Sequence, residues 1–294
     1  MAENSFFRAL VNETGAVCWL HQHGQAACQQ RRNELKFVIE ELFSLKGRVA
    51  LITGGNGGLG RVIALAYREA GAQVVITGRN PEKNQAIGQE LGDAKSVLLL
   101  DVYDEAAVER TMAQVNERFG RLDILVNNAG QSRRGYVPDV SKADWEDILN
   151  VNLTGPFLCA SHAAKRMIAG GRGGKIINVS SLYALYGPPN VASYAASKTG
   201  LLGLTRSLAV ELSKHNIQVN AILPGWYLTE MTGHLKNMPL ADYIRRKTPA
   251  GRWGNPQDLV GVAILLASAA SDFMTGTAIP IDGGYSVADR LLYD

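Results

Sequence analysis

Tyr194 and Lys198 stand four positions apart, at the end of a stretch that begins at Ser181. In a helix that starts near Ser193, this spacing places both side chains on one face, one turn apart. An ammonium group beside a phenol lowers the tyrosine pKa from its usual value of about 10. Such a tyrosine can exchange a proton with a substrate hydroxyl, and the Ser181 hydroxyl can hydrogen-bond the same oxygen. The same spacing also occurs on exposed helix faces, where the pair is worth about 0.2–0.5 kcal/mol, so the surrounding elements must decide.

Short apolar runs alternate with helical patterns from residue 46 onward. Strands are predicted at 48–53, 73–77, 96–100, 122–126, 175–179, 218–222 and 278–281. Helices are predicted at 61–70, 81–91, 105–119, 142–169, 193–214 and 257–270. Repeated strand–helix units with wholly apolar strands predict an α/β fold, a single doubly wound, Rossmann-type parallel sheet with helices on both faces. We recognise no linker within residues 45–294, which are therefore predicted to form one domain.

The composition narrows the classes of partner. The chain has 294 residues, a net charge of +3 and three cysteines. No run of basic residues exceeds three, so nucleic acid is not an expected partner. The longest apolar run, 260–270, is too short to span a bilayer, and no secretory signal is recognised, so no membrane partner is expected. A sparse, odd set of cysteines suits a reducing, cytoplasmic environment.

Residues 1–44 differ in composition from the rest. We predict an N-terminal extension that is partly disordered and carries a short helix at 34–43. The extension contains Cys18, His21, His23 and Cys28. Their spacing differs from the C-x₂₋₄-C and H-x₃₋₅-H pairs of structural zinc sites, and we predict no metal site.

A glycine-rich loop, T-G-G-N-G-G-L-G at 53–60, joins the first predicted strand of the domain to its first helix. Glycines in this position let backbone amides approach a pyrophosphate at the positive end of the helix, although a tight turn without a ligand is the alternative. An NAD enzyme of this architecture is expected to carry an acid after the second strand. Here the strand ends in Gly78 and Arg79. An arginine suits a 2′-phosphate and favours NADP, with NAD and a solvated arginine as the alternatives.

These patterns together resemble the short-chain dehydrogenase/reductase family. The resemblance spans about residues 45–287 and depends on T-G-x-x-x-G-x-G at 53–60, N-N-A-G at 127–130, V-N-L-T-G at 151–155, Ser181 with Tyr194 and Lys198, P-G-x-x-x-T at 224–229, and D-G-G-Y at 282–285. It implies that residues 45–294 are a dinucleotide-binding catalytic domain. Members transfer a hydride between nicotinamide and a secondary alcohol or ketone. They usually assemble through their long central helices, so a homotetramer is expected.

The resemblance also implies residue roles. Tyr194 is expected to be the general acid/base, and Ser181 to orient the substrate oxygen. Lys198 is expected to hold the nicotinamide ribose, and Asn152 to support a bend in the long helix and a water chain to solvent. The expected cofactor-binding residues are Thr53, Gly54, Asn56, Gly58, Leu59, Gly60, Arg79, Asp101, Val102, Asn128, Ala129, Gly130, Pro224, Gly225 and Thr229, together with Tyr194 and Lys198.

Three further segments resemble the gluconate 5-dehydrogenase and 2-deoxygluconate 3-dehydrogenase group: F-S-L-K-G at 43–47, A-G-Q-S-R-R at 129–134 and P-A-G-R-W-G at 249–254. The small-molecule substrate is therefore expected to be a sugar acid. Arg133 or Arg134 can hold its carboxylate, unless both are simply exposed. Residues 226–248 are predicted as a lid. The alternatives are a 3-oxoacyl-carrier-protein reductase and a non-catalytic NADP-sensing protein.

Overall fold

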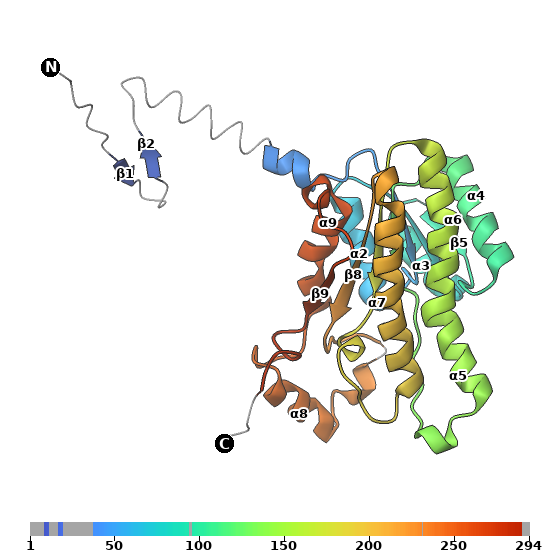
Figure 1. Cartoon of the computed structure of the whole chain (residues 1–294), viewed down its shortest axis with the longest axis vertical. Coiled ribbons are helices and arrows are strands. Elements are labelled where there is room, and N and C mark those ends of the chain that lie inside the picture. The colour runs from blue at the N-terminus through green and yellow to red at the C-terminus, as the bar shows by residue number, and fades with distance from the viewer. Residues whose placement is uncertain (1–8, 12–16, 20–37, 94–95, 231, 290–294) are drawn as a thin grey trace. The chain divides into compact units, whose positions relative to one another are not determined.

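The computed structural model describes residues 9–11, 17–19, 38–93, 96–230 and 232–289 (Figure 1). The chain divides into two compact units, residues 1–44 and 45–294. In the first unit, β1 (Ala9–Val11) and β2 (Val17–Trp19) pair antiparallel, two strands that the sequence did not predict. Residues 38–43 are helical, and the remainder of the helix predicted at 34–43 lies outside the described residues. Cys18 belongs to β2, while His21, His23 and Cys28 also lie outside them.

The second unit is built on a parallel sheet of seven strands, as predicted. In spatial order the strands are β5 (Val97–Leu99), β4 (Gln73–Gly78), β3 (Val49–Thr53), β6 (Ile124–Asn127), β7 (Gly174–Val179), β8 (Ile217–Pro224) and β9 (Ala278–Ile281). Every neighbouring pair is parallel. The order reverses between β3 and β6, and open α/β sheets bind ligands outside the carboxyl ends of strands at such a switch point.

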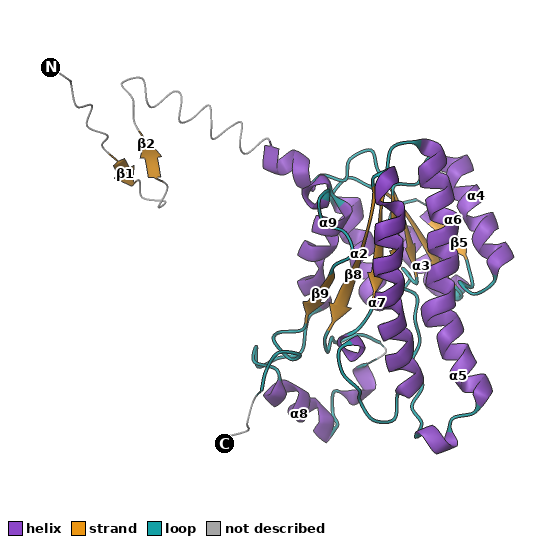
Figure 2. Ribbon diagram, viewed as in Figure 1, coloured by secondary structure: helices purple, strands orange, loops and turns teal. Residues whose placement is uncertain are grey.

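Helices cover both faces of this sheet (Figure 2). One apolar cluster combines strand residues such as Leu51 with α4 (Glu105–Phe119), α6 (Gly155–Gly170) and α7 (Ala192–Leu212). The other combines Ala50 and Ile52 with α2 (Gly58–Glu69), α3 (Pro81–Glu90) and α9 (Val260–Ala267). Successive strand residues point to opposite faces, and here both faces are buried. The wholly apolar strands follow from that burial.

The helix predicted at 142–169 is interrupted. It consists of α5 (Lys142–Leu149), a π-helical turn (Asn150–Thr154) and α6. Pro156 stands in the first turn of α6, where its missing N–H would have no helical partner. A π-turn inside a helix re-aims the side chains it carries, and such turns are frequent at functional sites. The turn contains Asn152.

The segment after β8 returns to the sheet through two helical pieces. A short 3₁₀ turn (Gly233–Leu235) and α8 (Pro239–Lys247) lie within the predicted lid at 226–248. A second 3₁₀ turn (Pro256–Leu259) precedes α9, so the helix predicted at 257–270 is shorter than expected. Among the described residues, no helix has both the length and the apolar character needed to cross a bilayer.

Candidate active site

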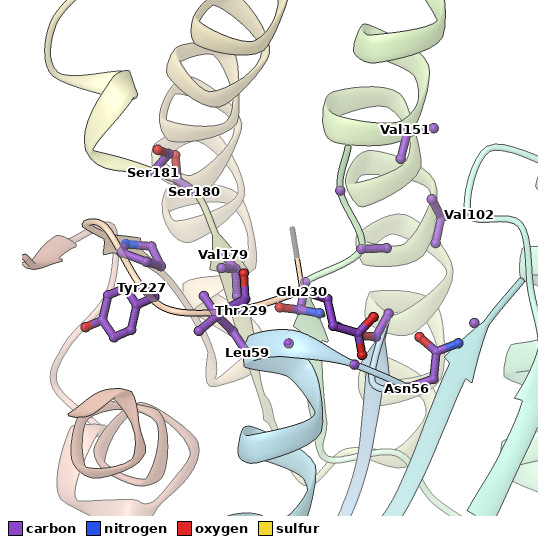
Figure 3. Close-up of a pocket in the computed structure, with 18 of the residues that line it drawn as sticks. Asn56, Leu59, Val102, Val151, Val179, Ser180, Ser181, Tyr227, Thr229 and Glu230 are labelled. Carbon is purple, nitrogen blue, oxygen red and sulfur yellow. Dashed lines mark hydrogen bonds between the residues drawn. The ribbon is translucent and has the colours of Figure 1, made fainter. Parts of the chain in front are cut away.

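A cavity of about 450 Å³ lies at the carboxyl ends of the central strands. Its lining includes the glycine loop after β3, the turn after β6, the beginning of α7 and the segment after β8. The cavity therefore occupies the switch point of the sheet, the position expected for a dinucleotide. Figure 3 shows residues from these separate segments around it.

Most of the predicted site residues line this cavity. They are Gly54, Asn56, Gly58, Leu59, Arg79, Asp101, Val102, Asn128, Ala129, Gly130, Ser181, Tyr194, Lys198, Pro224, Gly225 and Thr229. Thr53, Gly60 and Asn152 do not line it. These three were predicted from their places in motifs, and they act on the residues that form the wall.

Thr53 and Gly60 hold the glycine loop against the turn after β6. The backbone N–H groups of Asn128 and Ala129 donate to Thr53 Oγ1, at 3.0 and 3.1 Å. The Asn128 side chain donates to the carbonyl oxygens of Thr53 and Gly54, at 3.0 and 2.9 Å. A Cβ on Gly60 would lie 2.3 Å from the Asn128 amide nitrogen, so only glycine permits this contact. Gly54 has φ +62°, in the left-handed region.

The other side of the loop is fixed to the end of β4. Asn56 donates to the Asn84 side chain at 2.7 Å, and Asn84 donates to the Gly78 carbonyl at 2.9 Å. Arg79 follows directly; its side chain is 61% exposed and forms an ion pair with Asp101 at 3.9 Å. The closely packed glycine loop, the helix beginning behind it and an accessible guanidinium beside it fit a 2′-phosphorylated dinucleotide.

Tyr194 and Lys198 both lie in the first two turns of α7. Lys198 Nζ is 5.7 Å from the centroid of the Tyr194 ring and donates to the Val179 carbonyl at 2.9 Å. Burial raises the pKa of Tyr194, and its hydrogen bond with Ser181 opposes this shift. Burial also lowers the pKa of Lys198 to about 8. The prediction that Lys198 lowers the tyrosine pKa is therefore wrong, because desolvation outweighs the neighbouring ammonium group.

Asn152 is completely buried behind this pair. Its side-chain oxygen accepts from the Gln131 N–H, and its amide donates to the Gln131 carbonyl, both at 2.9 Å. The same amide donates to Ser197 Oγ at 3.1 Å, and Ser197 Oγ donates to the Tyr194 carbonyl at 2.7 Å. Asn152 therefore connects the π-turn to the helix that carries the tyrosine.

Two charged residues at the cavity were not predicted. Lys83 on α3 and Glu230 after β8 both line it and form an ion pair with each other. Neither belongs to a motif, and they are 147 residues apart. No local signal could have paired them. Asn127, by contrast, was expected at the cleft but is buried, and it donates to the Asn178 side chain at 2.9 Å.

The two arginines after β6 differ in their surroundings. Arg133 forms ion pairs with Asp144 and with Asp147, the latter at 3.5 Å. Arg134 is exposed and forms no ion pair with any described residue. Burial raises the pKa of Tyr183 to about 12, and the positive charge of Arg134 opposes that shift. The Tyr183 ring makes an edge contact with the Tyr194 ring, with centroids 6.2 Å apart.

Aromatic side chains continue beyond Tyr194. Tyr183 contacts Trp226 edge to face, at 5.9 Å between centroids, and Trp226 contacts Trp253 at 5.6 Å. Such rings offer apolar faces and polar tips. No group of three or more His, Cys, Asp or Glu side chains within the described part of the chain is placed to hold a metal ion.

Residues 54–286 match the family model described as enoyl-(acyl carrier protein) reductase. A 2-dehydro-3-deoxy-D-gluconate 5-dehydrogenase from Escherichia coli (strain K12) is 42% identical over 252 residues, which cover 84% of this chain and 99% of that protein. A 3-oxoacyl-[acyl-carrier-protein] reductase from Aquifex aeolicus (strain VF5) is 36% identical over 244 residues, 82% of this chain and 98% of that protein. The crystal structure of a gluconate 5-dehydrogenase from Burkholderia cenocepacia J2315 in complex with NADP and tartrate has a TM-score of 0.81 and 39% identity, and covers 85% of this chain and 99% of that one.

Proposed function

The chain belongs to the short-chain dehydrogenase/reductase family, and from this we propose that it is an NADP-dependent oxidoreductase that interconverts a sugar acid and its keto form. The observation that carries the proposal is the meeting of Ser181, Tyr194 and Lys198 in one dinucleotide-sized cavity with Arg79. The NADP complex of the related gluconate 5-dehydrogenase supports the choice of cofactor.

In this proposal the cofactor, when bound, supplies or accepts the hydride. Tyr194 delivers the proton to the substrate oxygen, because a phenol whose pKa is raised stays protonated near neutral pH and can act as an acid. Ser181 shares that oxygen through its hydroxyl. Lys198, with a pKa of about 8, carries a positive charge below that pH and binds the nicotinamide ribose.

We assign the substrate carboxylate to Arg134. Arg133 is engaged by two aspartates of α5, whereas Arg134 lies near enough to Tyr183 to oppose its pKa shift. A guanidinium binds a carboxylate through two parallel hydrogen bonds. Trp226 and Tyr183 then provide apolar faces for the carbon chain of a polyhydroxy acid.

Two alternative functions remain distinct from this one. A 3-oxoacyl-carrier-protein reductase would use the same cavity and would need a salt-sensitive complex with an acidic carrier protein. An NADP-sensing protein would bind the cofactor without turnover. The homotetramer and the cytoplasmic location expected from the sequence belong to the main proposal, and light scattering of the purified chain tests the tetramer.

Oxidation of NADPH with 5-ketogluconate, simple ketones and oxoacyl thioesters separates the three functions. We expect turnover with the keto acid and a roughly tenfold or greater loss of kcat/KM in Arg134→Ala, because a charge-assisted hydrogen bond contributes about 1.5–3 kcal/mol. Arg133→Ala is the matched control, with a smaller loss expected. Preferred turnover of thioesters, or tight NADPH binding with no turnover, would reject the sugar-acid proposal.

A further inference from the structure

Glu230 reaches into the cofactor cavity from the segment that follows β8. Its carboxylate forms an ion pair with Lys83, and its Oε1 lies 3.9 Å from the position that a Cβ on Gly57 would occupy. Figure 3 shows the side chain over the beginning of α2, between Thr229 and Asn56. The carboxylate therefore lies against the glycine loop.

The beginning of α2 offers an anion site without an anionic side chain of its own. Gly57 is the N-cap, no side chain caps the helix, and its first turn contains no acidic residue. The first amides of a helix have no intrahelical partner and carry partial positive charge. Phosphates bind at such positions. The Glu230 carboxylate thus presents to this loop the same charge that a phosphate would.

We propose that Lys83 binds the 2′-phosphate of NADP, and that Glu230 is an internal anion that competes with this phosphate for Lys83. Lys83 lies in the first turn of α3, four residues after Arg79, and both side chains line the cavity. The Lys83 side chain is 49% exposed and that of Glu230 69%, so the pair can separate without exposing buried charge. The inference rests on the proposed use of NADP.

The competition also connects the cofactor to the lid segment. Thr229 precedes Glu230 and lies next to the same loop, with its Cβ 3.8 Å from the position of a Cβ on Gly58. Exchange of the carboxylate for phosphate at Lys83 removes the charged contact that holds this segment to the loop. NADP, but not NAD, is therefore expected to release it.

The test measures the Kd of NADPH and NADH by nicotinamide fluorescence, for the full chain and the variants Glu230→Gln, Lys83→Gln and the double variant. We expect Glu230→Gln to tighten NADPH about fivefold, the order that an exposed ion pair is worth. Lys83→Gln should weaken NADPH about tenfold. NADH should change less than twofold in each variant. In the Lys83→Gln background, the second substitution should have no effect.

Glu90→Gln is the matched control, because Glu90 forms an exposed ion pair with Arg61 and does not line the cavity. NADPH affinity that is unchanged or weakened in Glu230→Gln overturns the competition. Equal losses of both cofactors in Lys83→Gln overturn the assignment to the 2′-phosphate.

Arg79→Ala separates this inference from the proposed function. Selective loss of NADPH in that variant, with inert Lys83 and Glu230 variants, rejects only the competition. No binding of NADPH by the unaltered chain rejects both.

Discussion

Replacement of Lys198 by Met is expected to stabilise the fold while it abolishes catalysis. The side chain is 4% exposed, and burial lowers its pKa from 10.5 to about 8. At about 1.36 kcal/mol per pKa unit, this difference corresponds to about 3 kcal/mol of unfavourable charge burial at pH 7. Loss of the hydrogen bond to the Val179 carbonyl offsets about 1 kcal/mol. The free energy of unfolding of Lys198→Met should therefore be about 2 kcal/mol higher.

The sign of the pH dependence follows from the lowered pKa. Between pH 8 and 10.5 the unfolded chain holds a proton on Lys198 that the folded chain has released. The unfolded state then binds more protons, so the stability of the unaltered protein rises with pH through this window. The variant lacks this titration. Its advantage should shrink by about 2 kcal/mol between pH 7 and pH 9.5.

Urea unfolding followed by tryptophan fluorescence at both pH values provides the measurement. Lys142→Met is the matched control, because Lys142 is 84% exposed and forms a surface ion pair with Glu146. Its effect should stay within about 0.5 kcal/mol at either pH. If Lys198→Met were less stable than the unaltered protein, or if its advantage were the same at both pH values, burial of the ammonium charge would not be the cause.

Three further predictions follow from the site. Tyr194→Phe should lower kcat by about 10²–10⁴ and leave the NADPH Kd within about twofold, and a parallel loss of affinity in fluorescence titration would contradict a purely proton-transfer role. Gly60→Ala should lower the free energy of unfolding by about 1–3 kcal/mol in urea and weaken NADPH, because its Cβ would meet the Asn128 amide at 2.3 Å, whereas Gly261→Ala, in open space, should change stability by less than about 1 kcal/mol. The kcat/KM for ketone reduction should fall as pH rises through about 8, where Lys198 loses its charge, and a profile that is flat to pH 9.5 would show that this charge is not required.

The sheet was predictable because its strands are buried on both faces. Residues 50–52 alternate between the two apolar clusters, so every position had to be apolar. The π-turn at Asn150–Thr154 was not predictable from periodicity. It places Asn152 where it bonds both backbone groups of Gln131, and that partner comes from a different loop.

The glycine loop and the residues at strand ends were predictable for a related reason. Parallel strands bring their carboxyl ends to one edge, so Gly54, Arg79 and Asn128 had to lie near one another. Motif membership did not reveal which residues form the wall. Thr53 and Gly60 match the family pattern, yet they act behind the surface, through Asn128.

The protonation states of the site were the least predictable property. The four-residue spacing correctly placed Tyr194 and Lys198 on neighbouring turns, but it carries no information on desolvation or on the partner that Nζ selects. The same limit applies to Arg133, whose partners are on α5, and to Lys83, whose partner is Glu230. A charged side chain near a cavity can bind a ligand only to the extent that its own protein releases it. The pairing of charges across distant segments therefore decides which of the cations at this site are available to a substrate or cofactor.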